Sequence, residues 1–135
     1  MGRRRVPHTA DLRIEAWAAG REECVAEAVA AMVESFADLT GAAVTATEEV
    51  QFGPGPDPDL LAAVLEEVIY RLETDGQLPL ATDVTATGDG LQVRLTMVDA
   101  ATATPVGAAP KAVSLHDLRF GPGPEGWFCT VTLDV

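Results

Sequence analysis

Hydrophobic and polar residues alternate over residues 12–18, a pattern typical of a strand with one buried face. Related patterns predict further strands over residues 48–52, 82–87, 91–98 and 127–134. Gly88-Asp89-Gly90 stands between two of these segments and predicts a hairpin, because Asp-Gly tolerates the positive φ angles of a tight turn.

A strand over residues 111–120 changes parity along its length. Val113 and Leu115 share one face, whereas Leu118 and Phe120 have the opposite parity. A one-residue bulge near His116-Asp117 would turn both pairs inward, and bulges often redirect functional side chains. A strand that ends at this point is the alternative.

Two helices are expected in the first half of the chain. One begins at Glu22 and Glu23 and runs to about Leu39; the other has Asp57 as its N-cap and Pro58 in its first turn. Both are apolar around most of their circumference, more than a helix packed on a single layer requires. We therefore expect each helix to be covered on two sides.

The order of elements is β-α-β-α-β-β-β-β, which predicts an α+β fold. With 135 residues, 47% of them hydrophobic, the chain is expected to form one domain over residues 1–135.

The charge of the chain limits its partners. Nine Lys and Arg face 21 Asp and Glu, a net charge of −12, so the surface repels phosphates and strong direct nucleic-acid binding is not expected. Such a surface suits a basic protein partner or cations.

Cysteine usage and the lack of targeting signals indicate the compartment. Cys24 and Cys129 lie in apolar patterns, which predicts two buried thiols in a reducing cytoplasm rather than a disulfide. Without a signal peptide or an apolar run of about 20 residues, a cytoplasmic location and no membrane contact are expected.

Carboxylates at both ends of the chain are candidate metal ligands. Asp134 and the terminal carboxylate of Val135 follow a well-patterned strand, and Asp11 precedes another. If Asp11 comes alongside, three carboxylates form a hard-oxygen site for Ca²⁺ or Mg²⁺/Mn²⁺. His8, three residues before Asp11, is a further candidate; an ordinary loop histidine is the alternative.

Lys111 and His116 could supply acid–base chemistry or a phosphate contact near these carboxylates. A solvated lysine is the alternative for Lys111. Ser114 lies two residues before His116 without a nucleophile elbow, which argues against hydrolase chemistry.

Three segments together resemble the archease family: His8-Thr9-Ala10-Asp11, Lys111-Ala112-Val113-Ser114-Leu115-His116, and the final Leu133-Asp134-Val135. The resemblance spans nearly the whole chain and implies a layered β/α/β domain with both helices between sheets. The chain departs from the family pattern at Pro7, Arg13 and Leu115.

The resemblance also implies a non-enzymatic function. It predicts an accessory protein of an RtcB-type RNA ligase that promotes guanylylation and multiple turnover of the ligase in tRNA splicing and RNA repair. It implies metal ligation by Asp11, Asp134 and Val135, and a role in activity for Lys111.

Two other hypotheses remain open from the sequence. One is a metal-dependent phosphohydrolase that uses Asp11, Asp134, Lys111 and His116. The other is a protein-interaction or chaperone-like module without a metal site.

Overall fold

The computed structural model describes residues 1–7 and 11–135 of the chain. Four strands form an antiparallel sheet in the order β1-β2-β9-β8. Their bounds are Gly2–Pro7 for β1, Asp11–Ala18 for β2, Gly126–Asp134 for β9 and Ala112–Gly123 for β8. The central strands of this sheet therefore come from opposite ends of the sequence.

A second antiparallel sheet is built from the middle of the chain. Its order is β4-β6-β5. The bounds are Val44–Phe52 for β4, Gly90–Asp99 for β6 and Gln77–Thr87 for β5.

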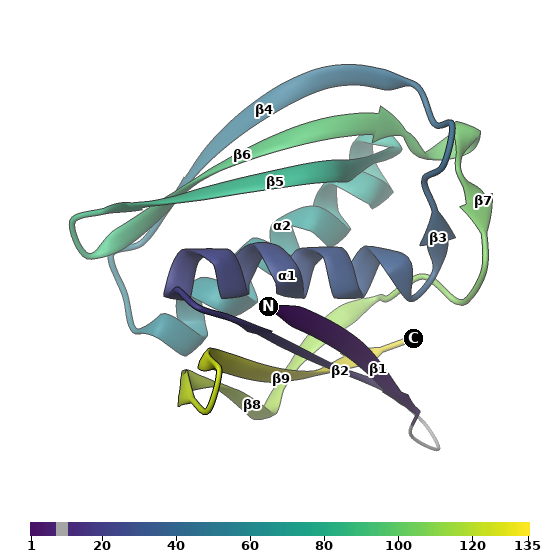
Figure 1. Cartoon of the computed structure of the whole chain (residues 1–135). Coiled ribbons are helices and arrows are strands. Elements are labelled where there is room, and N and C mark those ends of the chain that lie inside the picture. Colours follow the sequence, from purple (N-terminus) through teal and green to yellow (C-terminus); the bar gives the residue numbers. More distant parts are fainter. Residues whose placement is uncertain (8–10) are drawn as a thin grey trace.

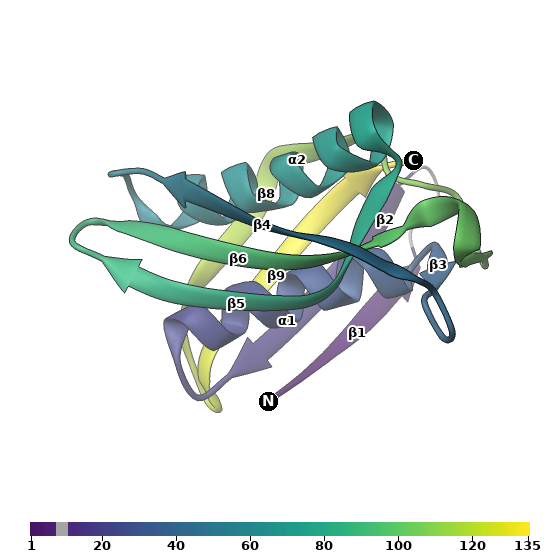
Figure 2. The same ribbon diagram turned by 90° about the horizontal axis from the view of Figure 1, so that it is seen from above.

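Two helices, α1 (Arg21–Glu34) and α2 (Asp57–Asp75), lie between the sheets. Helix α1 packs against β2 and β5, and α2 against β8 and β5 (Figure 1). Viewed from above, the strands of the two sheets cross at an angle over the helices (Figure 2). The predicted α+β fold with helices enclosed by sheets is confirmed, and the two-sided cover explains why both helices are apolar around most of their surface.

The first helix ends earlier than its sequence pattern predicts. It stops at Glu34 rather than near Leu39, with Ser35 as the C-cap, whose hydroxyl donates to the Met32 carbonyl at 2.6 Å. The next residues form the short strand β3 (Ala37–Asp38), which pairs with β7 (Thr104–Pro105). Strand β7 is preceded in the chain by the short 3₁₀ helix η1 (Ala100–Thr102).

Strand β1 and the N-cap of α2 also differ from the sequence predictions. Strand β1 was not predicted, because its run of arginines hides the alternation that marks a half-buried strand. Pro56, rather than Asp57, is the N-cap of α2, so Asp57 lies in the first helical turn, where a carboxylate favours the helix dipole.

Strand β8 contains the predicted bulge, and it is larger than one residue. The register with β9 passes from Ser114 opposite Thr132 to Arg119 opposite Thr130. Five steps along β8 thus match two along β9, and Asp117 takes a positive φ of 63°. The bulge turns Leu118 and Phe120 toward the core, as expected. The expectation that Leu115 also faces inward is wrong, because the chain leaves the β8–β9 ladder after Ser114 and Leu115 is 68% exposed.

The two cysteines meet in the core, and both are free thiols, as predicted. Cys24 of α1 lies 3.6 Å from the Ala16 carbonyl oxygen, and Ala16 is the register partner of Cys129 on β9. The hydrogen bond to Cys24 and burial raise the pKa of the Cys129 thiol. In residues 1–7 and 11–135, no helix is long and apolar enough to cross a membrane.

Candidate functional site

Asp11 and Asp134 are brought together by the pairing of β2 with β9. They are register partners, and such partners in an antiparallel sheet have Cα atoms about 4.5–5.5 Å apart. Because the neighbouring Leu133 is buried among the helices, strand alternation directs the Asp134 side chain to the opposite, solvent face. Two carboxylates from distant parts of the sequence therefore lie side by side at one end of the sheet.

Lys111 lies beside Asp134 on the other side of β9. Its backbone N–H donates to the Asp134 carbonyl oxygen at 2.7 Å, which extends the β8–β9 ladder. The exposed Lys111 also borders a cavity of about 350 Å³ whose other wall is formed by Glu66, Tyr70 and Glu73 of α2. The lysine is thus placed between the carboxylate pair and an acidic helix face.

The other sequence candidates occupy different positions. Val135 directly follows Asp134 and is 40% exposed. His116 lies in the β8 bulge, is 88% exposed at its side chain, and has its Nε2 atom 3.5 Å from the Asp117 carboxylate. The bulge begins after Ser114, which pairs with Thr132, and Thr132 is two residues from Asp134 on β9. His116 therefore lies outside the ladder positions that flank the carboxylate pair. His8 lies outside the described residues.

The carboxylates of Asp11 and Asp134 supply only part of the donor set that a metal centre requires. In the part of the chain that the structure describes, no group of three or more His, Cys, Asp or Glu side chains is arranged to hold an ion. Asp11 and Asp134 supply two carboxylates, which are the oxygen ligands that Ca²⁺ and Mg²⁺ prefer. Metal ligation by Asp11, Asp134 and Val135 stays a prediction, in which the carboxylate of Val135 would be the third donor.

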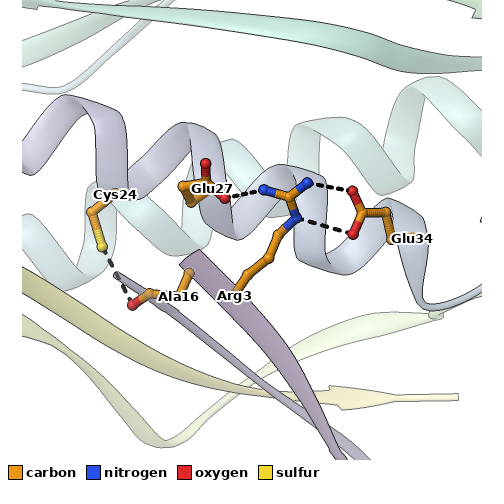
Figure 3. Close-up of polar contacts among 5 residues, drawn as sticks. All are labelled: Arg3, Ala16, Cys24, Glu27 and Glu34. Carbon is orange, nitrogen blue, oxygen red and sulfur yellow. Dashed lines mark hydrogen bonds and ion pairs between the residues drawn. The ribbon is translucent and has the colours of Figure 1, made fainter. Parts of the chain in front are cut away.

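One ionic cluster near this sheet was not identified from the sequence. Arg3 on β1 reaches across α1 to ion-pair with Glu27 and with Glu34, one oxygen of which lies 2.6 Å from an Arg3 nitrogen (Figure 3). The hydrogen bonds that Arg3 donates to these carboxylates, Glu34 first, raise the pKa of Arg3. Glu27 and Glu34 lie seven residues apart on one face of α1. This acidic stripe is the feature of the sequence that could have indicated a pairing with a basic residue such as Arg3.

The fold and the carboxylate pair define a class: an α+β sandwich that encloses two helices and joins aspartates from its two central strands at one sheet end. The sequence profile of the archease protein family (MTH1598/TM1083) matches residues 4–135. The chain belongs to the archease family, and this membership fits an accessory protein rather than an enzyme.

Relatives and solved structures agree with this assignment. The chain is 52% identical over 134 residues to a Mycobacterium tuberculosis protein named "Probable protein archease", covering 99% of this chain and 75% of that protein.

Two solved structures share the fold at 21% identity each. One is a crystal structure of an archease, described as a possible chaperone, from Thermotoga maritima, with a TM-score of 0.69 over 96% of this chain and 94% of that one. The other is a solution structure of Methanobacterium thermoautotrophicum protein 1598, with a TM-score of 0.76 over 99% of both chains.

Proposed function

We propose that this protein is a cytoplasmic accessory factor of an RtcB-type RNA ligase and promotes guanylylation and turnover of the ligase in tRNA splicing and RNA repair. Family membership supports an accessory role, and the resemblance of the three sequence segments implies the ligase partner. The observation that carries the proposal is the register pairing of Asp11 with Asp134, since it assembles two of the three implied ligands.

The proposed site holds a divalent cation, Ca²⁺ or Mg²⁺/Mn²⁺, between Asp11, Asp134 and the carboxylate of Val135. Two neighbouring carboxylates repel each other, and a bound cation offsets this repulsion, so the pair favours a cation. At the sheet end, the bound cation would be accessible to a partner protein. Lys111, held to the backbone of Asp134, is placed to contact a phosphate or an acidic group of that partner.

The acidity of the chain suits a protein contact. With a net charge of −12, it is attracted to a basic surface, which is what an enzyme that binds RNA presents. His8 and His116 remain candidates for the contact surface, because the exposed His116 side chain projects from a bulge.

The direct experiment is ligase guanylylation with and without this protein, using the ligase from the same genome. We expect acceleration by the wild type and a loss of at least tenfold for Asp11→Asn and Asp134→Asn. Asp83→Asn is the matched control, because Asp83 is exposed on β5 of the other sheet. No acceleration, or equal loss in the Asp83 control, would contradict the proposal.

Calorimetry with Ca²⁺, Mg²⁺ and Mn²⁺ tests the cation separately. At a concentration one hundred times Kd, a bound ion stabilises the fold by about 2.7 kcal/mol, and this gain should vanish in Asp11→Asn. A tag after Val135 converts the proposed carboxylate ligand into an amide and should also remove binding. Heat and stabilisation that persist in both variants would exclude this site.

The other two hypotheses give different results in the same experiments. A metal-free interaction module would show no cation binding, and Asp11→Asn would behave like the wild type. A phosphohydrolase would turn over phosphoesters without any ligase and would lose this activity in Asp11→Asn.

A further inference from the structure

The four-stranded sheet has one face on the helices and one face on solvent (Figure 1). Ile14 on β2 and Val131 on β9 are fully buried, so strand alternation directs the residues that directly precede and follow each of them outward. We call this solvent side the outer sheet face. The residues on it that matter here are Arg13, Trp17, Ser114, Arg119, Phe128 and Thr132.

Two arginines on the outer sheet face lack a carboxylate partner within the described residues. Arg3, Arg4, Arg21, Arg71 and Arg94 each form an ion pair with a glutamate or aspartate. Arg13 and Arg119 are exposed and form none among residues 1–7 and 11–135, although acids outnumber bases 21 to 9. Where carboxylates are in such surplus, cations left unpaired are available to an external anion.

The unpaired arginines flank the central strand β9. Arg13 on β2 lies opposite Thr132, and Arg119 on β8 lies opposite Thr130, one outward position further along β9. Ser114 also pairs with Thr132, so one row of the face carries an arginine and two hydroxyl groups. Guanidinium and hydroxyl groups are the side-chain donors that proteins direct at phosphate oxygens.

Aromatic rings continue the face beyond the arginines. Trp17 and Phe128 are register partners on β2 and β9, and both are only half-buried. The guanidinium carbon of Arg4 lies over the Trp17 ring, 5.0 Å from its centroid, and Arg4 is paired with Glu15. Glu15 shares this face with the Asp11–Asp134 pair at the end of the sheet. Aromatic rings on an open sheet surface are suited to stacking unpaired bases.

The outward face of the other sheet differs in both respects. Strands β4, β5 and β6 are fully described, and their single aromatic residue, Phe52, is buried. Their one arginine, Arg94, is paired with Glu49. Unpaired arginines beside half-buried rings are therefore a feature of one sheet, and not a general property of the strands.

We infer that the outer sheet face binds a single-stranded nucleic acid, with backbone phosphates between Arg13 and Arg119 and bases on Trp17 and Phe128. The net charge of −12 argues against extended binding, yet charges farther away than a Debye length, about 8 Å at physiological ionic strength, are largely screened. The acidic surface of the opposite sheet lies two layers away. On this face, Glu15 is paired with Arg4, and Asp11 and Asp134 lie at one end of the sheet, beyond Arg13. An acidic protein segment could use the arginines but gains little from the two rings, so a nucleic acid is favoured.

The test is fluorescence anisotropy of a labelled, unstructured oligouridylate titrated with the protein alone, without ligase or divalent cations. We expect the double variant Arg13→Ala/Arg119→Ala to bind at least tenfold more weakly than the wild type. Its slope of log K against log salt should be shallower by about 1.4, because each phosphate contact to a single strand contributes about 0.7. Trp17→Leu should weaken binding at least fivefold and leave the salt slope unchanged.

Arg94→Ala is the matched control, since it removes an exposed arginine from the other sheet. Phe128→Leu should reproduce the Trp17→Leu result if that variant folds poorly. No saturable binding by the wild type, equal weakening by Arg94→Ala, or binding of polyglutamate in place of RNA would overturn the inference. The assay contains no ligase, so its failure would leave ligase activation untouched, and the reverse also holds.

Discussion

Replacing Arg3 with methionine should destabilise the fold through one of its two ion pairs. The Arg3 side chain is 33% exposed, while its partners differ: Glu27 is 10% exposed and Glu34 is 57% exposed. Methionine keeps most of the apolar stem of the arginine, so the variant removes the charge rather than the packing. It leaves the Glu27 carboxylate without its cation in a nearly buried position on α1.

The expected magnitude follows from this difference in exposure. Breaking a fully buried pair costs about 3–5 kcal/mol, and water around the partly exposed Arg3 reduces the cost here to about 1–3 kcal/mol. Losing the Glu34 pair alone, as in Glu34→Ala, should cost about 0–1 kcal/mol because that carboxylate is solvated. At about 4 °C per kcal/mol for a chain of this size, Tm should fall by about 4–12 °C in the first variant and by less than about 4 °C in the second.

Urea unfolding and thermal scans of Arg3→Met, Glu34→Ala and the double variant Arg3→Met/Glu27→Met provide the measurement. The double variant should recover most of the lost stability, because two apolar groups replace the stranded charge. If Arg3→Met and Glu34→Ala cost the same, or if the double variant recovers nothing, burial of Glu27 is not what makes the cluster important.

Three further predictions concern other parts of the fold. Cys24 and Cys129 should resist iodoacetamide in the native state and both react in urea, because both side chains are fully buried and out of reach of the reagent; rapid native labelling of either thiol would contradict this burial. Gly126→Ala should destabilise far more than Gly41→Ala: both have positive φ, which costs an alanine about 1–2 kcal/mol, but only at Gly126 would the added Cβ meet backbone carbonyl oxygens at 2.6 and 2.8 Å. Equal urea midpoints for the two would refute that comparison. Asp117→Gly should be neutral or stabilising, whereas Asp117→Val should cost about 1–3 kcal/mol, since a β-branched residue fits a φ of 63° poorly; a neutral Val variant would show that the bulge relaxes at little cost.

The sequence predicts the elements that contact the core along their whole length, whether on one side, as the strands do, or on two, as the helices do. Alternation in β2 and β9 and the wide apolar surfaces of α1 and α2 each reflect direct contact with the core, so pattern and structure agree. Strand β1 escapes prediction because it is an edge strand in which ion pairs replace apolar burial. Arg3 pairs with Glu27 and Glu34 of α1, and Arg4 with Glu15 of β2.

Helix and strand ends depend on single local interactions, which periodicity does not encode. Ser35 stops α1 through a hydrogen bond to its own helix, although apolar spacing continues to Leu39. The parity change in β8 did predict a bulge, since Leu118 and Phe120 must face the core, but its size depends on the backbone conformation of Asp117.

The candidate site shows the same division. The sequence predicts that Asp11 could approach Asp134, and the β2–β9 pairing makes them neighbours. It could not predict that His116 is carried away on the bulge, because three extra residues in β8 change the direction of a side chain without changing the spacing. The outer sheet face was missed for another reason: Arg13 and Arg119 are 106 positions apart, and only the register of three strands places them around one strand.

The interleaved origin of the two sheets has a consequence for synthesis on the ribosome. Strands β4, β5 and β6 are made one after another, with only α2 between β4 and β5, so they can pair while the chain is still growing. The sheet that carries Asp11 must wait, because β9 fills the gap between β2 and β8 and is made last of all the strands. A nascent product that stops before β9 therefore lacks both the central strand of that sheet and Asp134.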